Sequence, residues 1–168
     1  IVTGAGRGIG RAIALSLAEH GCSVMLAARS EGELNAVRGE IETAGGKAAC
    51  TVCDMGDEAS VVALVSVTLE TFGRLDVLVN NAGFGIYGPM EHSHTSDWDA
   101  MMAVNARGPY TLCREAVAHL RKQPISYIVN IGSVVSIKGY AKQAIYTASK
   151  HALHGMTKAL TREVQSDN

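Results

Sequence analysis

A tyrosine and a lysine four positions apart are residue types suited to proton transfer. Tyr146 and Lys150 stand in the run Tyr-Thr-Ala-Ser-Lys, and a spacing of i, i+4 puts both on one face of a helix. An ammonium group within about 4–6 Å stabilises a phenolate and lowers the pKa of a tyrosine from about 10 toward neutrality, so Tyr146 could both donate and accept a proton. Ser133 could hydrogen-bond a substrate oxygen and help to position it. Tyr–Lys pairs at this spacing are common on ordinary helices, so their surroundings must decide whether this pair takes part in chemistry.

Glycines near the start of the chain suit a phosphate-binding loop. The segment Thr-Gly-Ala-Gly-Arg-Gly-Ile-Gly spans residues 3–10 and stands between an apolar run and a helical pattern. Gly4, Gly8 and Gly10 would let backbone N–H groups approach a pyrophosphate, and the N-terminus of the following helix favours the anion. The spacing differs from the common Gly-x-Gly-x-x-Gly fingerprint, and an ordinary glycine turn is the alternative interpretation.

The residues after the second apolar run bear on which dinucleotide would bind. An NAD site usually has an acidic residue here for the ribose 2′-hydroxyl, but Ala28 stands at that point and Arg29 and Ser30 follow. Arg29, together with Arg7 of the glycine loop, would suit a 2′-phosphate, because guanidinium groups bind phosphate through forked N–H donors. Two solvated surface arginines are the alternative. The sequence therefore predicts NADP(H) in preference to NAD(H).

Two later segments carry weaker signals. Asp54 follows the third apolar run and could accept a hydrogen bond from an adenine amino group, although a helix cap or a turn would also use an aspartate there. The segment Asn80-Asn81-Ala82-Gly83 follows the fourth run, and its small residues would let the chain pass close beside a cofactor. Cys50 and Cys53 have the spacing of half a metal site, but in a strand they would point to opposite faces. We therefore predict no metal site.

Short apolar runs alternate with longer helical patterns, and this order predicts a parallel sheet. Each run is apolar on both faces, as in strands that helices cover on both sides. Such alternation builds a doubly wound, Rossmann-like α/β fold whose ligands bind beyond the carboxyl ends of the strands. The predicted strands are residues 1–2, 23–28, 48–53, 75–79 and 127–131. The predicted helices are residues 10–20, 30–44, 58–72, 97–121 and 144–164, the second of which opens with a capping box over Ser30–Glu33.

Composition narrows the classes of function. The chain has 168 residues, 47% of them hydrophobic, and a formal net charge of −1, which fits a single domain over residues 1–168. The motifs above make this a predicted dinucleotide-binding domain. Because there is no basic block, neither nucleic acid nor a membrane is expected as a partner. Four cysteines in apolar runs favour reduced thiols and a cytoplasmic location. The chain opens inside an apolar run without a starting Met, so we expect it to be trimmed at its front.

Taken in order, these motifs resemble the short-chain dehydrogenase/reductase family. The resemblance rests on Thr3-Gly4-x-x-x-Gly8-x-Gly10, Asn80-Asn81-Ala82-Gly83, Ser133 and Tyr146-x-x-x-Lys150, with Asn105 at the place of the family's helix asparagine. It implies that Tyr146 is the general acid/base, that Lys150 holds the nicotinamide ribose, that Ser133 orients the substrate and that Asn105 helps to hold a water of the proton relay. It further implies cofactor contacts by Gly4, Arg7, Gly8, Ile9 and Gly10 at the pyrophosphate and adenosine end, by Asp54 and Met55 at adenine, and by Asn81, Ala82 and Gly83 beside the adenosine ribose.

The activity implied by the resemblance is hydride transfer between nicotinamide C4 and a carbonyl or carbinol carbon of a small molecule. Oxoacyl thioesters, sugar alcohols and steroid alcohols are the substrate classes left open. A non-catalytic dinucleotide-binding sensor and an inactive fragment are the alternatives, because family members are longer and the last strands of their sheet are expected to lie beyond this chain.

Two expectations concern partners. Apolar positions on helices 97–121 and 144–164 exceed what one sheet face needs, and the family uses these helices between subunits, so a homodimer or homotetramer is expected. Apolar side chains near the predicted ligand edge indicate a partly apolar substrate pocket: Phe84, Ile86, Tyr87, Ile137 and Tyr140.

Overall fold

The fold is built on a parallel β-sheet. A computed structural model of the protein describes residues 1–165, and within them the strands follow the order β3-β2-β1-β4-β5. The strands are β1 (Val2–Thr3), β2 (Ser23–Ala28), β3 (Lys47–Val52), β4 (Val77–Asn80) and β5 (Tyr127–Asn130). Val2 pairs in parallel with Leu26 of β2 and with Val79 of β4. The predicted doubly wound, Rossmann-like α/β fold is therefore confirmed.

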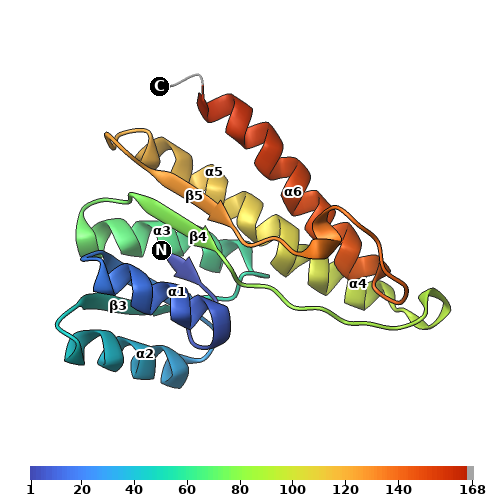
Figure 1. The fold of residues 1–168 in the computed structure, drawn as a ribbon, viewed down its shortest axis with the longest axis horizontal. Helices are drawn as coiled ribbons and strands as arrows, with labels where there is room; N and C mark the ends of the chain where they lie inside the picture. Colours follow the sequence, from blue (N-terminus) through green and yellow to red (C-terminus); the bar gives the residue numbers. More distant parts are fainter. Residues whose placement is uncertain (166–168) are drawn as a thin grey trace.

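Helices pack on both faces of this sheet (Figure 1). They are α1 (Gly8–Glu19), α2 (Glu31–Thr43), α3 (Glu58–Phe72), α4 (Thr95–Met102), α5 (Gly108–Leu120) and α6 (Ala144–Val164). On one face α1 and α2 enclose a core that includes Leu26 and Leu34. On the other face α3 and α5 enclose a core that includes Leu64, Leu78 and Leu112, and α6 packs partly against it.

Side-chain caps set the starts of two helices. The Ser30 hydroxyl accepts from the Glu33 N–H at 3.4 Å and so caps α2, which is one half of the predicted capping box. The Asp57 carboxylate caps α3 by accepting from the Ala59 N–H at 3.2 Å. Both caps come shortly after the carboxyl end of a strand. The starts of α2 and α3 therefore lie at the same edge of the sheet as the glycine loop after β1.

The fourth predicted helix, residues 97–121, is present as one helical run, but it is not a regular α-helix throughout. A π-helical turn, Ala103–Arg107, separates α4 from α5. Asn105 lies in this turn and is fully buried. The helical pattern of apolar residues did not predict a buried polar side chain at this position. Pro109 follows in the first turn of α5 and has no N–H for the carbonyl four residues earlier, which breaks the regular helical ladder at this point.

The expectation that every strand is covered on both faces is also wrong. Tyr127 and Val129 of β5 are 61% and 42% exposed, and they alternate with half-buried residues. In β4, by contrast, Leu78, Val79 and Asn80 are all buried. The difference follows from position, because β4 lies inside the sheet whereas β5 stands at its margin among the described residues.

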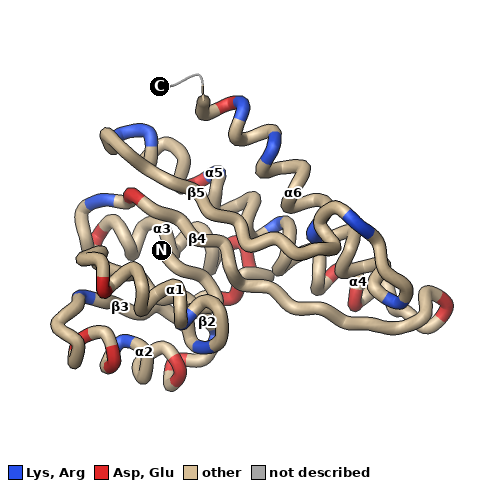
Figure 2. Tube along the Cα trace, viewed as in Figure 1, with Lys and Arg blue, Asp and Glu red and all other residues tan. Residues whose placement is uncertain are grey.

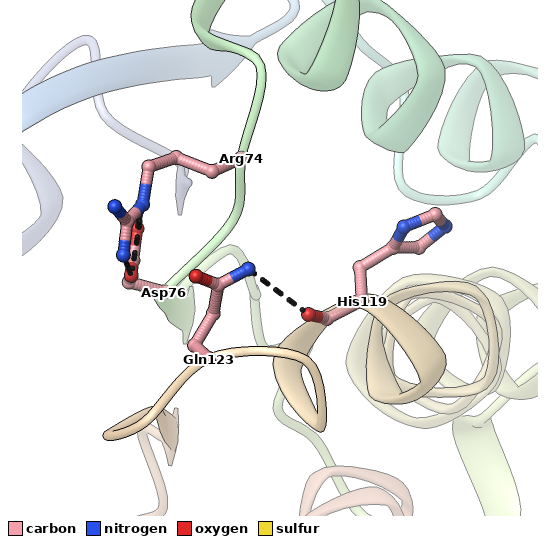
Figure 3. A network of polar contacts seen from close by, with 4 residues as sticks. All are labelled: Arg74, Asp76, His119 and Gln123. Carbon is pink, nitrogen blue, oxygen red and sulfur yellow. Dashed lines mark hydrogen bonds and ion pairs between the residues drawn. The ribbon is translucent and has the colours of Figure 1, made fainter.

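The amino ends of the strands carry polar contacts that close turns. Figure 3 shows the Arg74 guanidinium beside the Asp76 carboxylate just before β4, at 2.6 Å, and the Gln123 side-chain amide donating to the His119 carbonyl at 3.4 Å just before β5. Solvent screens an exposed ion pair of this kind. Charged residues of both signs are spread over the helices (Figure 2). None of the residues predicted to bind or react lies among these turn contacts.

Candidate active site

A cavity of about 650 Å³ lies along the carboxyl ends of the strands. Its wall comes from the loop after β1, the end of β2, the start of α2, the loops after β3, β4 and β5, and the first two turns of α6. The strand order reverses beside it, because β1 pairs with both β2 and β4. A parallel sheet opens a crevice at such a switch point, and that crevice is where this fold binds ligands.

The glycine loop forms the wall beside β1. Gly4 has a φ of 65°, in the left-handed region that favours glycine. A Cβ on Gly10 would overlap the Gly4 carbonyl oxygen and lie 2.5 Å from Asn81 Nδ2, so the start of α1 needs a glycine there. The predicted residues on the wall are Gly4, Arg7 and Ile9, whereas Gly8 (φ 56°) and Gly10 shape the loop from outside the wall.

Thr3 joins the loop after β4 to the first strand. Its hydroxyl oxygen accepts from the backbone N–H groups of Asn81 and Ala82, both at 3.0 Å, and its hydrogen goes to the Val79 carbonyl at 3.3 Å. The Asn81 side chain returns to β1 by donating to the Thr3 carbonyl at 2.9 Å. Asn81, Ala82 and Gly83 consequently line the cavity. The sequence analysis placed Thr3 in the glycine motif but assigned no contact to its side chain.

An acidic side chain lies on the wall where the sequence predicted only basic ones. Arg29 and Ser30 line the cavity together with Arg7, and both arginines are exposed. Glu33, from the first turn of α2, lines the same cavity and covers Gly6, since a Cβ on Gly6 would lie 2.9 Å from Glu33 Oε2. The sequence analysis considered an acidic side chain only at the end of β2. The Ser30–Glu33 cap spacing was the signal that could have located this one.

Of the two residues predicted at adenine, only Met55 lies on the wall. Met55 is 6% exposed and lines the cavity. Asp54 lies outside the lining residues; its side chain is exposed and accepts from the Gly56 N–H at 2.8 Å. Asp54 thus closes a turn, which is the alternative that the sequence left open.

Cys50 and Cys53 serve packing. Cys53 belongs to the core beneath α3 and α5, whereas Cys50 packs against the core beneath α1 and α2, and burial raises the pKa of both thiols. Within residues 1–165, no group of three or more His, Cys, Asp or Glu residues is arranged to hold a metal ion. In the same described part of the chain, no helix has the length and apolar character needed to cross a bilayer.

Tyr146 and Lys150 stand on the β5 side of the cavity, in the first two turns of α6. Lys150 is 5% exposed and donates to the Ile131 carbonyl at 2.8 Å. Burial lowers the pKa of Lys150, because desolvation disfavours the ammonium form. The Tyr146 ring meets the Tyr87 ring edge to face, with centroids 5.7 Å apart. Helix α6 thus brings both residues to the cavity that the glycine loop also lines.

Ser133 starts a short 3₁₀ helix, Val134–Ser136, and lies outside the residues that line the cavity. Its hydroxyl oxygen accepts from the Val135 N–H at 3.3 Å, and its own N–H donates to Ser136 Oγ at 3.0 Å. This reciprocal pair is a capping box. The Ser133 hydroxyl therefore has its position fixed by the backbone, while its hydrogen remains available to an acceptor.

Asn105 connects three segments around Lys150. Its Nδ2 donates to the Phe84 carbonyl at 2.7 Å and to Ser149 Oγ at 3.0 Å, and its Oδ1 accepts from the Phe84 N–H at 3.0 Å. Ser149 in turn donates to the Tyr146 carbonyl at 2.8 Å. Both hydrogens of the Asn105 amide are used within the protein, so this side chain holds the loop after β4 against α6. Ser149 was missed by the prediction, although it stands inside the Tyr146–Lys150 motif.

Two asparagine side chains and a threonine hydroxyl also hold α6 to the sheet. Asn80 Nδ2 of β4 donates to Asn130 Oδ1 of β5 at 2.8 Å, and Asn130 Nδ2 donates to Thr157 Oγ1 of α6 at 2.9 Å. Asn80 is 2% exposed, and a hydrogen bond in such a low-dielectric place is costly to lose. Thr157 lies about two turns beyond Lys150, so this contact helps to fix the direction of the helix that carries Tyr146.

A parallel sheet with this strand order and a glycine loop after its first strand defines the Rossmann-like class of nucleotide-binding proteins. Comparison with protein families narrows the class. The model of the short-chain dehydrogenase family matches residues 1–168, and the chain belongs to this family.

Relatives agree with this assignment. An uncharacterized oxidoreductase of Thermotoga maritima is 41% identical over 160 residues, covering 95% of this chain and 63% of the relative. A 3beta-hydroxysteroid dehydrogenase of Mediterraneibacter gnavus is 40% identical over 161 residues, covering 95% of this chain and 58% of the relative. A metagenomic short-chain oxidoreductase, solved in complex with NADP, superposes with a TM-score of 0.95 at 40% identity, covering 99% of this chain and 76% of the other. The chain thus spans about three fifths of the length of these two curated relatives.

Proposed function

We propose that the protein is an NADP(H)-dependent oxidoreductase that interconverts a carbonyl compound and a secondary alcohol. The observation that carries this proposal is the placement of Tyr146 and Lys150 on the wall of the cavity that the glycine loop also lines. A dinucleotide in the cavity would have its phosphates at the loop and its reactive ring on the side of a proton donor. The relatives named as an oxidoreductase and a hydroxysteroid dehydrogenase support the class of reaction.

The residues of this chain fit a nicotinamide dinucleotide. The closely packed Gly4 and Gly10 let the backbone and the N-terminus of α1 approach a pyrophosphate. Arg7 and Arg29, exposed on the wall at the β2 end, would hold a 2′-phosphate through forked N–H donors. Met55 and the segment Asn81–Gly83 would contact the adenosine part. The NADP complex of a 40% identical relative supports this choice of cofactor.

Tyr146 would handle the proton of the reaction. The bound cofactor would supply the hydride chemistry at nicotinamide C4. The Tyr146 hydroxyl would give its proton to the carbonyl oxygen in reduction and remove the hydroxyl proton in alcohol oxidation. Lys150, whose ammonium is held by the Ile131 carbonyl, would hold the nicotinamide ribose next to Tyr146. Ser133 would donate its free hydroxyl hydrogen to the substrate oxygen.

The substitution Tyr146→Phe in the full-length protein tests this function. Removal of a general acid/base costs about 10²–10⁴-fold in rate, so NADPH consumption with a panel of ketones and aldehydes should fall by that factor, while NADPH binding persists because the ring remains. Tyr127→Phe, on the exposed face of β5, is the matched control and should retain full activity. Undiminished turnover by Tyr146→Phe would refute the acid/base role. NADPH binding without any turnover by the unmodified protein would instead favour a dinucleotide-binding sensor.

We further propose that the protein is a homodimer or homotetramer of the cytoplasm. Trp98 of α4 and Tyr110 of α5 are 44% and 51% exposed, and large aromatic side chains of this kind are enriched where subunits meet. Light scattering of the full-length protein measures the mass of the assembly directly.

The cytoplasmic location is supported by the cysteines of the described residues, which are free thiols and so suit a reducing compartment.

A further inference from the structure

A second tyrosine stands against the ring of Tyr146. Tyr87 lies on the extended segment between β4 and α4, which Figure 1 shows running away from the end of β4. The planes of the two rings meet at 89° with centroids 5.7 Å apart. Tyr87 lines the same cavity and is nevertheless 59% exposed. More than half of this residue is therefore accessible to another molecule.

Gly85 provides the space in which this ring lies. A Cβ on Gly85 would lie 2.6 Å from Cζ and 2.9 Å from Cε1 of Tyr87, and would overlap the Tyr87 hydroxyl. Gly85 is not among the glycines with positive φ, so backbone conformation does not demand a glycine there. The demand comes from the Tyr87 ring, which folds back over the chain two residues before it. Gly85 on one side and Tyr146 on the other define the place of the ring.

Within this cavity, the wall beside the ring is apolar, whereas a smaller cavity that Tyr87 also lines includes Asp97 and Lys142. Phe84 lines the cavity with Tyr87 and is 37% exposed. The charged residues of the described cavity wall are Arg7, Arg29 and Glu33, which belong to the glycine loop and the β2–α2 region, and Lys150. On the Tyr146 side, Lys150 is thus the one charged side chain among the described lining residues, and its ammonium is engaged by Ile131. An uncharged group beside the reacting carbon fits this wall.

We propose that Tyr87 is a specificity-determining residue whose ring supports a flat apolar group next to the reacting carbonyl. The substrate class is then aryl or unsaturated cyclic ketones and the corresponding secondary alcohols. This inference rests on the function proposed above. Aromatic pairs prefer offset-stacked or edge-to-face contact and gain about two- to tenfold in affinity from it, whereas a short aliphatic chain has no ring to offer. A ring already held in place loses little freedom when the substrate arrives.

Kinetics of the full-length protein with acetophenone and 2-butanone test the proposal. Tyr87→Ala should raise the KM for acetophenone about tenfold and change that for 2-butanone less than twofold, because specificity is a ratio between two substrates. Tyr87→Phe keeps the ring and should keep the ratio of the unmodified protein. An equal change for both ketones, or an unchanged ratio in Tyr87→Ala, would overturn the proposal.

Gly85→Ala separates the position of the ring from its presence. The added Cβ must displace the Tyr87 ring, so this variant should lose most of the preference for acetophenone although Tyr87 is intact. In the double variant Gly85→Ala, Tyr87→Ala there is no ring to displace, and the ratio should equal that of Tyr87→Ala alone. A further loss in the double variant would show that Gly85 acts through something other than Tyr87, which contradicts the argument.

A binding measurement keeps this inference distinct from the proposed function. Calorimetric titration of acetophenone into the protein saturated with NADP⁺ needs no turnover. The dissociation constant should rise about tenfold in Tyr87→Ala and in Gly85→Ala, and stay within twofold in Tyr87→Phe. If binding follows this pattern and neither ketone is reduced, the proposed reaction fails and the role of Tyr87 in binding stands. If the ketones are reduced and the variants bind acetophenone as the unmodified protein does, the role of Tyr87 fails alone.

Discussion

Ser149→Ala is the substitution for which the structure gives the most definite stability change. Ser149 is fully buried, and its hydroxyl accepts from Asn105 Nδ2 at 3.0 Å and donates to the Tyr146 carbonyl at 2.8 Å. Alanine leaves almost the same volume but removes both contacts. The Asn105 amide keeps its bond to the Phe84 carbonyl, and its second hydrogen is left buried without that acceptor.

The magnitude follows from that single orphaned donor. A buried donor without a partner costs about 1–3 kcal/mol, and in a protein of this size each kcal/mol lowers Tm by about 2–4 °C. We therefore expect the free energy of unfolding to fall by about 1–3 kcal/mol in urea titrations followed by far-UV circular dichroism, with an unchanged m value.

Thr161→Ala is the matched control for this measurement. It removes a hydroxyl that also donates to a backbone carbonyl of α6, that of Thr157, but at an exposed position. Surface changes of this kind usually stay within about 0.5 kcal/mol. If Ser149→Ala unfolds no more easily than Thr161→Ala, the contact between the π-helical turn and α6 does not hold these segments together, and the account of Asn105 given above is wrong.

Three further predictions concern the glycine loop, the cofactor and Lys150. Gly10→Ala forces a Cβ into the Gly4 carbonyl, so we expect the free energy of unfolding in urea to fall by about 1–3 kcal/mol. Gly39→Ala, with open space around it, should lose no stability, and equal stability of both variants would show that the loop does not require a glycine at position 10. NADPH should bind more tightly than NADH in fluorescence titrations, and Arg29→Ala should weaken NADPH binding about tenfold without affecting NADH binding. An equal loss of affinity for both cofactors would show that Arg29 does not bind the 2′-phosphate. Burial lowers the pKa of Lys150, so the folded protein releases this proton at a lower pH than the unfolded chain. The destabilisation caused by burying the ammonium is therefore complete below the folded pKa and decreases as pH rises toward 10.5. The stability of the protein relative to Lys150→Met should therefore rise as pH increases through the folded pKa of Lys150 toward 10.5, and parallel stability curves would show that burial does not disfavour the Lys150 ammonium.

Much of the fold could be predicted because its signals are local. The strand and helix ranges found in the structure agree with the predicted ones to within two residues, but the π-helical turn inside the fourth helix was not predicted. There the helical periodicity of apolar residues continues on both sides of Ala103–Arg107, and it contains no sign of the buried amide that interrupts it. Pro109 was a local signal for the break, but a proline in the first turn of a helix is also ordinary.

The candidate site likewise has a part that the sequence predicted from local signals and a part that depends on the tertiary structure. The sequence by itself determined the glycine loop, the strand and helix alternation and the Tyr146–Lys150 pair, because these depend on residues within a few positions of one another. Only the tertiary structure decided that Thr3 bonds the backbone of Asn81, 78 positions away, and that Asn105 bonds Ser149, 44 positions away. Contacts of this kind exist only once the sheet and its helices bring distant segments together, and no periodicity along the chain encodes them. The same holds for Tyr87: its apolar character was visible in the sequence, but its contact with Tyr146 depends on how the segment after β4 crosses the start of α6.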